Sequence, residues 1–441
     1  MNTYRLLIHS ADQIVQVTNN GQLSLRGNEM AKIAILQKTN EGDGCSIVIG
    51  NEGEIVAIDN DAQIAQRLKN ATYDKVINAT GQCIIPGLID AHTHPIWEGD
   101  RVHEFAMKIA GSSYMDIHNA GGGIGFTVKE TCNATDDELS DSLTERLNRM
   151  LVSGTTLAEA KSGYGLDKQQ ETRLIRILNR ASHDLPIDLS ITYLGAHSIP
   201  EGLSSEEATE KVISEQIPAL EYLKSLNISV DNIDVFCEKG VYDVDQTERI
   251  LRAGKNIGLN VNFHGDELHA MGAAEMGAAL GSVAISHLEE ISSEGIQKMA
   301  DSDSIAVLLP VTAYILGLKP PPARKMINAG IAVCLGTDFN PNCYCLSMPL
   351  AMHYACIILK MTLEEVLAAA TINAAASLKK SKDYGSLEIG KKGDLLVINS
   401  QKWEHLIYQL GGHDHTIEYV IKSGRIVYKR KTREQKLSVS Q

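Results

Sequence analysis

The stretch Pro86–Pro95, PGLIDAHTHP, is an apolar segment that stops at two histidines separated by a single threonine. The apolar run starts at Cys83 and shows no polar–apolar alternation, which is typical of a strand buried on both faces of a parallel sheet. Residues two apart on a strand point to the same side, so His92 and His94 can reach one ion together. The stretch therefore predicts a core strand that ends at a functional site.

Seven further apolar runs follow, and longer segments with helical spacing separate them. The eight runs are CIIPGLIDAH (83–92), TTLAEAK (155–161), DLSITYLGAH (188–197), NIDVFCE (232–238), LNVNFHG (259–265), SVAISH (282–287), SIAVLLP (304–310) and IAVCLGTD (331–338). The clearest helix is expected over 362–378, where Thr362 and Glu365 form a capping-box pattern. Eight buried strands that alternate with helices predict an α/β fold, a (β/α)8 barrel of the TIM type.

The two ends of the chain have a different pattern from the middle. Residues 45–58 read as two β-rich runs around a turn at 51–53, and residues 417–429 read as a second hairpin around 422–424. These ends flank one long middle segment. We therefore expect strands from both ends to share a small sheet outside the barrel.

Composition excludes several classes of partner. The net charge of −14 argues against a nucleic-acid surface, which would need a basic face. No apolar run approaches about 18 residues, so no membrane span is expected. The eight cysteines include no C-x-x-C pair, which favours free thiols and a cytosolic protein. A homodimer is the commonest default among oligomers.

Ligand-type residues gather at the predicted strand ends, where barrel enzymes place their chemistry. His92 and His94 end the first strand, His264 lies on the fifth and Asp338 ends the eighth. Three imidazoles and a carboxylate form a site for one divalent metal ion, with zinc favoured and iron the alternative. Any one of these residues alone has an ordinary structural explanation, such as a core histidine or a turn aspartate. Their coincidence at three strand ends favours the metal site.

The chain resembles the amidohydrolase superfamily, metal-dependent hydrolases that combine a barrel with a small β-sandwich. PGLIDAHTHP signals the superfamily, and KSGYG (161–165), DVFCEKG (234–240) and DFNPN (338–342) are more specific. The resemblance implies a barrel over 86–382 and a composite β-sandwich from 1–85 and 383–441. It also implies a hydrolase of cyclic amides that converts 4-imidazolone-5-propanoate to N-formimidoyl-L-glutamate in histidine breakdown.

The resemblance also assigns catalytic roles. Asp338 is expected to be both a metal ligand and the base that takes a proton from water and passes it to the ring nitrogen. His287, at the end of the sixth strand, would orient water or stabilise the oxyanion, although a core histidine is the alternative. Glu267 is expected to accept a hydrogen bond from the ring N–H.

A substrate with a propionate group needs donors for its carboxylate. Arg101, seven residues beyond His94, offers a planar fork, and a surface arginine is the alternative. Tyr164 can offer a hydroxyl to the same acid. The resemblance makes His197 a substrate contact and Asn340 a contact to the formimidoyl-glutamate part.

Many members of the superfamily hold two metals bridged by a modified lysine at the end of the fourth strand. Here Glu238 precedes Lys239 at that point and Lys161 ends the second strand, so a single metal is expected. Two other functions stay open: another cyclic amidohydrolase or deaminase of the same superfamily, and a binding protein without catalysis.

Overall fold

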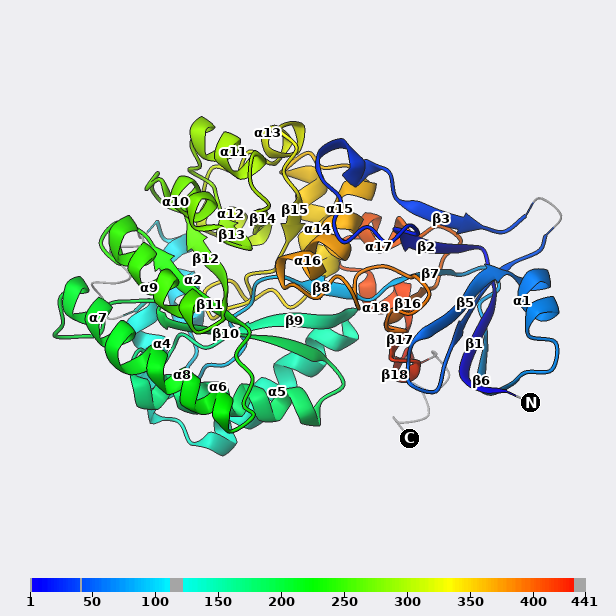
Figure 1. Cartoon of the computed structure of the whole chain (residues 1–441), viewed down its shortest axis with the longest axis horizontal. Helices are drawn as coiled ribbons and strands as arrows, with labels where there is room; N and C mark the ends of the chain where they lie inside the picture. The colour runs from blue at the N-terminus through cyan, green and yellow to red at the C-terminus, as the bar shows by residue number, and fades with distance from the viewer. Residues whose placement is uncertain (1, 40–41, 112–121, 432–441) are drawn as a thin grey trace.

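The computed structural model describes residues 2–39, 42–111 and 122–431. Its largest sheet has eight parallel strands in chain order, and they curve into a barrel surrounded by helices (Figure 1). The strands are β8 (Leu88–Asp90), β9 (Thr155–Lys161), β10 (Asp188–Ala196), β11 (Asn232–Cys237), β12 (Asn260–Gly265), β13 (Ala284–His287), β14 (Ile305–Leu308) and β15 (Val333–Leu335). The predicted α/β barrel is confirmed.

The barrel closes where its first and last strands meet. Beyond the ends of β8 and β15, Thr93 and Phe339 form a parallel bridge, and the Asp338 N–H donates to the carbonyl oxygen of His92 at 3.0 Å. This contact joins the loops that carry the H-x-H pair and the aspartate. The topology therefore brings the loops after the first and the last barrel strands together at one end of the barrel.

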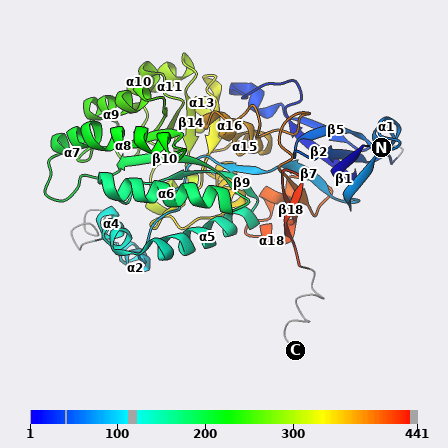
Figure 2. The same cartoon turned by 60° about the horizontal axis from the view of Figure 1, so that its bottom comes forward.

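Helices cover the outside of the barrel and pack against one another along it, as α5 and α6 do in Figure 2. The helices are α2 (Val102–Ile109), α4 (Ile124–Asn133), α5 (Asp136–Val152), α6 (Lys168–Asp184), α7 (Ser205–Lys211), α8 (Ile217–Ser225), α9 (Val244–Asn256), α10 (Ala273–Leu280), α11 (Ser293–Ala300), α12 (Pro310–Leu316), α13 (Ala323–Asn328), α14 (Met348–Ile357), α15 (Leu363–Ala369) and α16 (Ile372–Ser377). A π-helical turn, η2 (Val212–Gln216), joins α7 to α8.

The rest of the described chain forms two smaller sheets, of orders β5-β4-β1-β6 and β18-β17-β16-β7-β2-β3. Their elements are β1 (Thr3–Ala11), β2 (Gln13–Val17), η1 (Gly27–Ala31), β3 (Ala34–Gln37), β4 (Cys45–Ile49), β5 (Ile55–Asn60), α1 (Asp61–Arg67), β6 (Thr72–Asn78), β7 (Cys83–Pro86), β16 (Leu395–Ile398), α17 (His405–Tyr408), α18 (His413–Thr416), β17 (Ile417–Lys422) and β18 (Arg425–Lys429). The sheet that contains β7 joins strands from both ends of the chain, which confirms the shared sheet.

The two small sheets pack face to face. Buried apolar side chains of β1 and β4, such as Leu6 and Ile47, share one cluster with Ile84 of β7 and Leu395 of β16. The N- and C-terminal segments thus build one β-sandwich beside the barrel, as Figure 1 shows. The exact boundaries after 85 and 382 remain a prediction.

The first predicted strand differs from the observed arrangement, because it is two strands in two sheets. Gly87 separates β7, in the sandwich, from β8, in the barrel, and its N–H donates to the carbonyl oxygen of Asp394 at 3.0 Å. A Cβ at this position would lie 2.2 Å from Thr156 Oγ1. Glycine is needed here so that the chain can cross from one sheet to the other against β9.

The helix expected over 362–378 is also divided. The capping box of Thr362 and Glu365 is present at the start of α15. The helix stops after Ala369, because the Ala370 carbonyl oxygen accepts from the Ile89 N–H of β8 at 2.9 Å. Thr371 adopts a non-helical backbone, and α16 begins after it.

None of the helices in the described part of the chain combines the length and the apolar character that a bilayer crossing would require. The eight cysteines are free thiols, and six of them are buried.

Candidate active site

Three histidines converge at the carboxyl ends of the barrel strands. His92 and His94 follow β8, His264 lies on β12, and ligand atoms of the three rings lie within 4.8 Å of one another. All three are buried. Burial lowers the pKa of His92 and His94 well below the ordinary value, so both rings are neutral at physiological pH and keep a lone pair for a cation.

Asp338 joins the three histidines from the eighth strand. Its Oδ1 lies 3.5 Å from His92 Nε2 and 3.6 Å from His94 Nε2. Its other oxygen, Oδ2, accepts a 2.7 Å hydrogen bond from the Thr312 hydroxyl on α12. Burial raises the pKa of Asp338, against the opposing effect of the Thr312 hydrogen bond. One carboxylate oxygen therefore faces the imidazoles while the second is held in place.

Two polar partners behind the histidines set their orientation. Ser286 Oγ lies 2.9 Å from His92 Nδ1, and Asp234 Oδ1 accepts from His264 Nδ1 at 2.9 Å. The Nε2 atom of His92 is buried and has no hydrogen-bond partner among the described residues. Such partners fix the ring tautomer and leave the opposite nitrogen available for a metal. The donor set therefore fits a divalent cation.

Lys161 lies beneath this group rather than at a bridging position. Its Nζ donates to Glu159 Oε1 and to Asp234 Oδ2, each at 2.7 Å, and all three residues are fully buried. Burial by itself would raise the pKa of Asp234, but His264 and Lys161 outweigh it and lower the pKa to about 2. Asp234 is therefore an ionised carboxylate, and it accepts a hydrogen bond from His264 Nδ1–H.

His287 stands between two carboxyl groups. Its Nε2 lies 3.7 Å from Glu267 Oε2, and its Nδ1 lies 3.8 Å from Glu289 Oε2. The ring stacks on His264 with centroids 5.1 Å apart. Burial and the charges of Glu289 and Asp338 raise the pKa of Glu267 well above its ordinary value. The site therefore has titratable groups beside the candidate metal ligands.

The backbone is strained where these side chains are presented. His287, Leu288 and Asp338 have φ values of 76°, 68° and 50°, although none is glycine. Left-handed backbone at such residues costs free energy and concentrates at functional sites. Here it directs His287 and Asp338 towards the same cavity, which both of them line.

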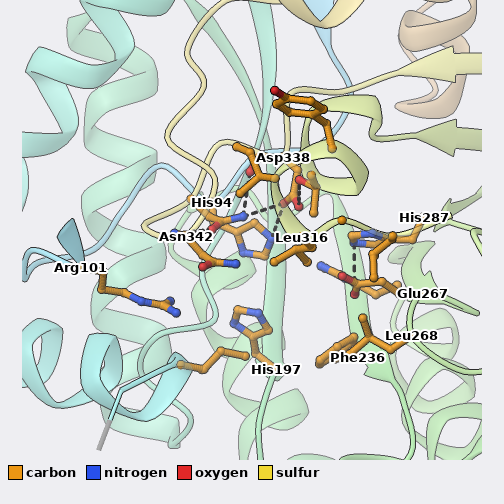
Figure 3. A pocket seen from close by; sticks show the side chains of 18 of the residues that line it. His94, Arg101, His197, Phe236, Glu267, Leu268, His287, Leu316, Asp338 and Asn342 are labelled. Carbon is orange, nitrogen blue, oxygen red and sulfur yellow. Dashed lines mark hydrogen bonds and ion pairs between the residues drawn. The ribbon is translucent and has the colours of Figure 1, made fainter. Parts of the chain in front are cut away.

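The cavity above the histidines has a volume of about 440 Å³, a size suited to a small molecule. All the predicted site residues except the fully buried His92 line it. Figure 3 shows Arg101 on one side of the cavity and Glu267 and His287 on the other. The structure therefore brings the predicted residues together around one space.

His197 and Tyr164 form part of the cavity wall next to the candidate metal ligands. The His197 ring stacks on His94 with centroids 4.9 Å apart, and Tyr164 lies 5.2 Å from His197 by the same measure. The His197 Nδ1 donates to the Gly163 carbonyl oxygen at 2.9 Å, and burial lowers its pKa to about 3. The ring is therefore neutral and presents Nε2 as a hydrogen-bond acceptor.

Arg101 and Asn340 are partly engaged within the protein. Arg101 donates from Nε and Nη2 to the two carboxylate oxygens of Glu104, at 2.9 and 2.6 Å. The Asn340 amide nitrogen donates to the Asp338 carbonyl oxygen at 2.8 Å, and its oxygen accepts from the backbone of Asn342 and Cys343. Only part of each side chain is left for a ligand.

Sequence reasoning missed the supporting residues of the site: Asp234, Ser286, Glu289, Thr312 and Lys108. A signal existed for Asp234, which is the one acid inside the apolar run NIDVF, and for Ser286, which precedes a strand-end histidine. Thr312 and Lys108 come from helices, and only the three-dimensional arrangement brings them to the cavity.

The fold and the site together define an α/β-barrel protein with a candidate metal centre. Its imidazoles and a carboxylate lie together at the carboxyl ends of the barrel strands and fit a divalent cation. The chain belongs to the amidohydrolase family, whose model matches residues 83–427.

Curated relatives extend the similarity to almost the whole chain. A probable imidazolonepropionase of Nematostella vectensis is 56% identical over 427 residues, which cover 97% of this chain and 99% of the relative. The protein of the same name from Homo sapiens is 54% identical over 427 residues, with the same coverage.

Solved structures agree on the fold. A zinc-bound adenosine deaminase from Xanthomonas campestris superimposes with a TM-score of 0.71 at 16% identity and covers 100% of this chain and 97% of its own. A guanine deaminase from C. acetobutylicum with bound guanine gives 0.67 at 18% identity, covering 96% of this chain and 99% of its own.

Proposed function

We propose that the chain hydrolyses the cyclic amide of 4-imidazolone-5-propanoate to N-formimidoyl-L-glutamate. The observation that carries the proposal is the convergence of His92, His94, His264 and Asp338 at a cavity that also has cationic side chains. The relatives named probable imidazolonepropionase, 53–56% identical in animals, support the same substrate. We place the reaction in the cytosol, in agreement with the free thiols.

The ligands proposed for one divalent ion, zinc or iron, are His92, His94, His264 and Asp338. A divalent ion in such a site lowers the pKa of water to roughly 7 and polarises a carbonyl. Asp338 accepts the proton of the attacking water and returns it to the ring nitrogen as the C–N bond breaks. Thr312 holds the second oxygen of this carboxylate and so keeps the accepting oxygen aimed at the cavity.

The remaining wall residues orient the ring. Glu267 accepts a hydrogen bond from the ring N–H, and His287 stabilises the oxyanion that develops on the carbonyl. Arg101 and Tyr164 bind the propionate end, His197 contacts the substrate through its accepting Nε2, and Asn340 contacts the formimidoyl-glutamate part of the product. Because Nε and Nη2 of Arg101 already pair with Glu104, we assign Nη1, which donates to no residue in the described part of the chain, to the substrate.

The purified full chain tests the proposal. We expect about one equivalent of metal by elemental analysis, and ultraviolet loss of the imidazolone ring that stops when a chelator removes the metal. Asp338→Asn should lower kcat by about 10²- to 10⁴-fold. His353→Asn is the matched control, because His353 contacts the Ile407 carbonyl oxygen and does not line the cavity.

Two results would contradict the proposal. A metal-loaded chain that leaves the imidazolone intact but releases ammonia from amino-substituted rings is a deaminase. A chain that binds no metal is the non-catalytic binding protein.

A further inference from the structure

Helix α2 is inverted relative to an ordinary surface helix. Its apolar residues Val102, Phe105 and Ile109 are 66%, 57% and 73% exposed, whereas Arg101 and Glu104 are 7% and 1% exposed. A surface helix normally turns its apolar stripe inward and its charges to solvent. The charged side chains of Arg101 and Glu104 therefore face the interior of the protein.

Lys108 belongs to this inward face. It is seven residues after Arg101, which is two helical turns, so the two side chains project from the same side. Lys108 is half-buried, lines the cavity beside Arg101, and donates a hydrogen bond from Nζ to Asn342 Oδ1. Figure 3 places Asn342 and Arg101 on the side of the cavity away from Glu267.

The charges on this side do not cancel. Arg101 forms a bidentate pair with Glu104, and Glu104 also accepts from the Gly123 N–H at 2.9 Å. Among the residues the structure describes, no carboxylate forms an ion pair with Lys108. Burial and the positive charge of Arg101 lower the pKa of Lys108, and the negative charge of Glu104 offsets only part of this effect.

We propose that Lys108 is a specificity-determining residue that binds the propionate carboxylate of the substrate together with Arg101. The inference rests on the proposed function, because it assumes an anionic substrate. Arg101 and Glu104 neutralise each other, so Lys108 supplies the net positive charge of this side. Asn342 Oδ1 accepts one hydrogen bond from the ammonium group, which orients it towards the cavity.

Steady-state kinetics of Lys108→Met test the proposal. We expect KM for 4-imidazolone-5-propanoate to rise about 10- to 100-fold with kcat changed by less than about 3-fold, because the lost contact is made equally in ground and transition states. Lys108→Arg should recover most of the affinity. Lys129→Met, which removes an exposed charge from α4 outside the cavity, should leave KM unchanged.

The neutral propanamide analogue of the substrate separates charge recognition from a structural effect. Lys108→Met should process this analogue as well as the unsubstituted chain does, whereas a merely structural defect would impair both substrates. A Lys108→Met variant whose KM for the acid stays within about 3-fold overturns the inference and leaves the proposed function intact.

Absence of turnover by the unsubstituted chain overturns the proposed function instead. Calorimetric binding of N-formyl-L-glutamate, a stable carboxylate probe, then decides the inference. If Lys108→Met binds the probe about 10- to 100-fold more weakly than the unsubstituted chain, the inference is supported. Equal affinity of the two chains for the probe overturns the inference.

Discussion

At the scale of single residues, the site depends on hydrogen bonds that hold the histidine side chains in one orientation. Asp234 receives both the backbone N–H and the Nδ1–H of His264, at 3.0 and 2.9 Å. Lys161 keeps that carboxylate ionised from the other side. The positive charge of Lys161 thus acts on the candidate metal site through Asp234.

Replacing Asp234 by Asn should weaken metal binding about 10- to 100-fold, because a neutral amide holds the His264 N–H less firmly. Competition with a fluorescent chelator measures this affinity. Asp231→Asn is the matched control, since Asp231 precedes the same strand and pairs with Lys380 at 3.0 Å. A folded Asp234→Asn chain with unchanged metal affinity would show that Asp234 has no part in presenting His264.

The four candidate metal ligands were predictable because each is a histidine or an acid in a motif at the end of a predicted strand. The way their hydrogen bonds are shared was not predictable. Arg101 looks in the sequence like a free guanidinium, yet Glu104, three residues later, occupies two of its nitrogens. Whether a charged side chain is available for a ligand depends on rotamers, which a residue pattern does not contain.

At the scale of elements, the sequence predicts all eight barrel strands because each lies in a short, mostly apolar run. It does not show where a run changes sheets. Residues 83–92 look uniform, yet β7 pairs with β16 while β8 pairs with β9. The break at Gly87 and the break at Thr371 both arise from contacts with segments far away in sequence, Thr156 and Ile89.

Gly87→Ala should lower the free energy of unfolding by about 1–3 kcal/mol, because the added methyl overlaps Thr156 and forces the strands apart. Urea unfolding followed by circular dichroism gives the value. Gly125→Ala in α4 is the control, as its Cβ would meet no atom within 4 Å, and it should leave stability equal or slightly higher. Equal stability of the two variants would mean that β9 can move to accommodate the side chain.

At the scale of the whole molecule, two polar clusters lie at opposite ends of the barrel, and we expect them to have different functions. The histidine cluster lies at the carboxyl ends of the barrel strands. Asp188, the first residue of β10, lies at the opposite end and accepts hydrogen bonds from Lys422 at 2.7 Å and from the Tyr384 hydroxyl at 2.8 Å. In barrel enzymes the carboxyl end carries chemistry and the amino end carries stability.

Asp188→Asn should therefore lower the melting temperature by about 2–5 °C while kcat/KM stays within about 2-fold. The loss follows because Lys422 and Lys392 converge on this carboxylate and join the C-terminal part of the chain to the barrel. Asp303→Asn is the matched control, since its pair with Arg26 is at the surface and should shift neither quantity. A fall in kcat/KM without a fall in melting temperature would contradict this division, because the amino end of the barrel would then influence the chemistry directly.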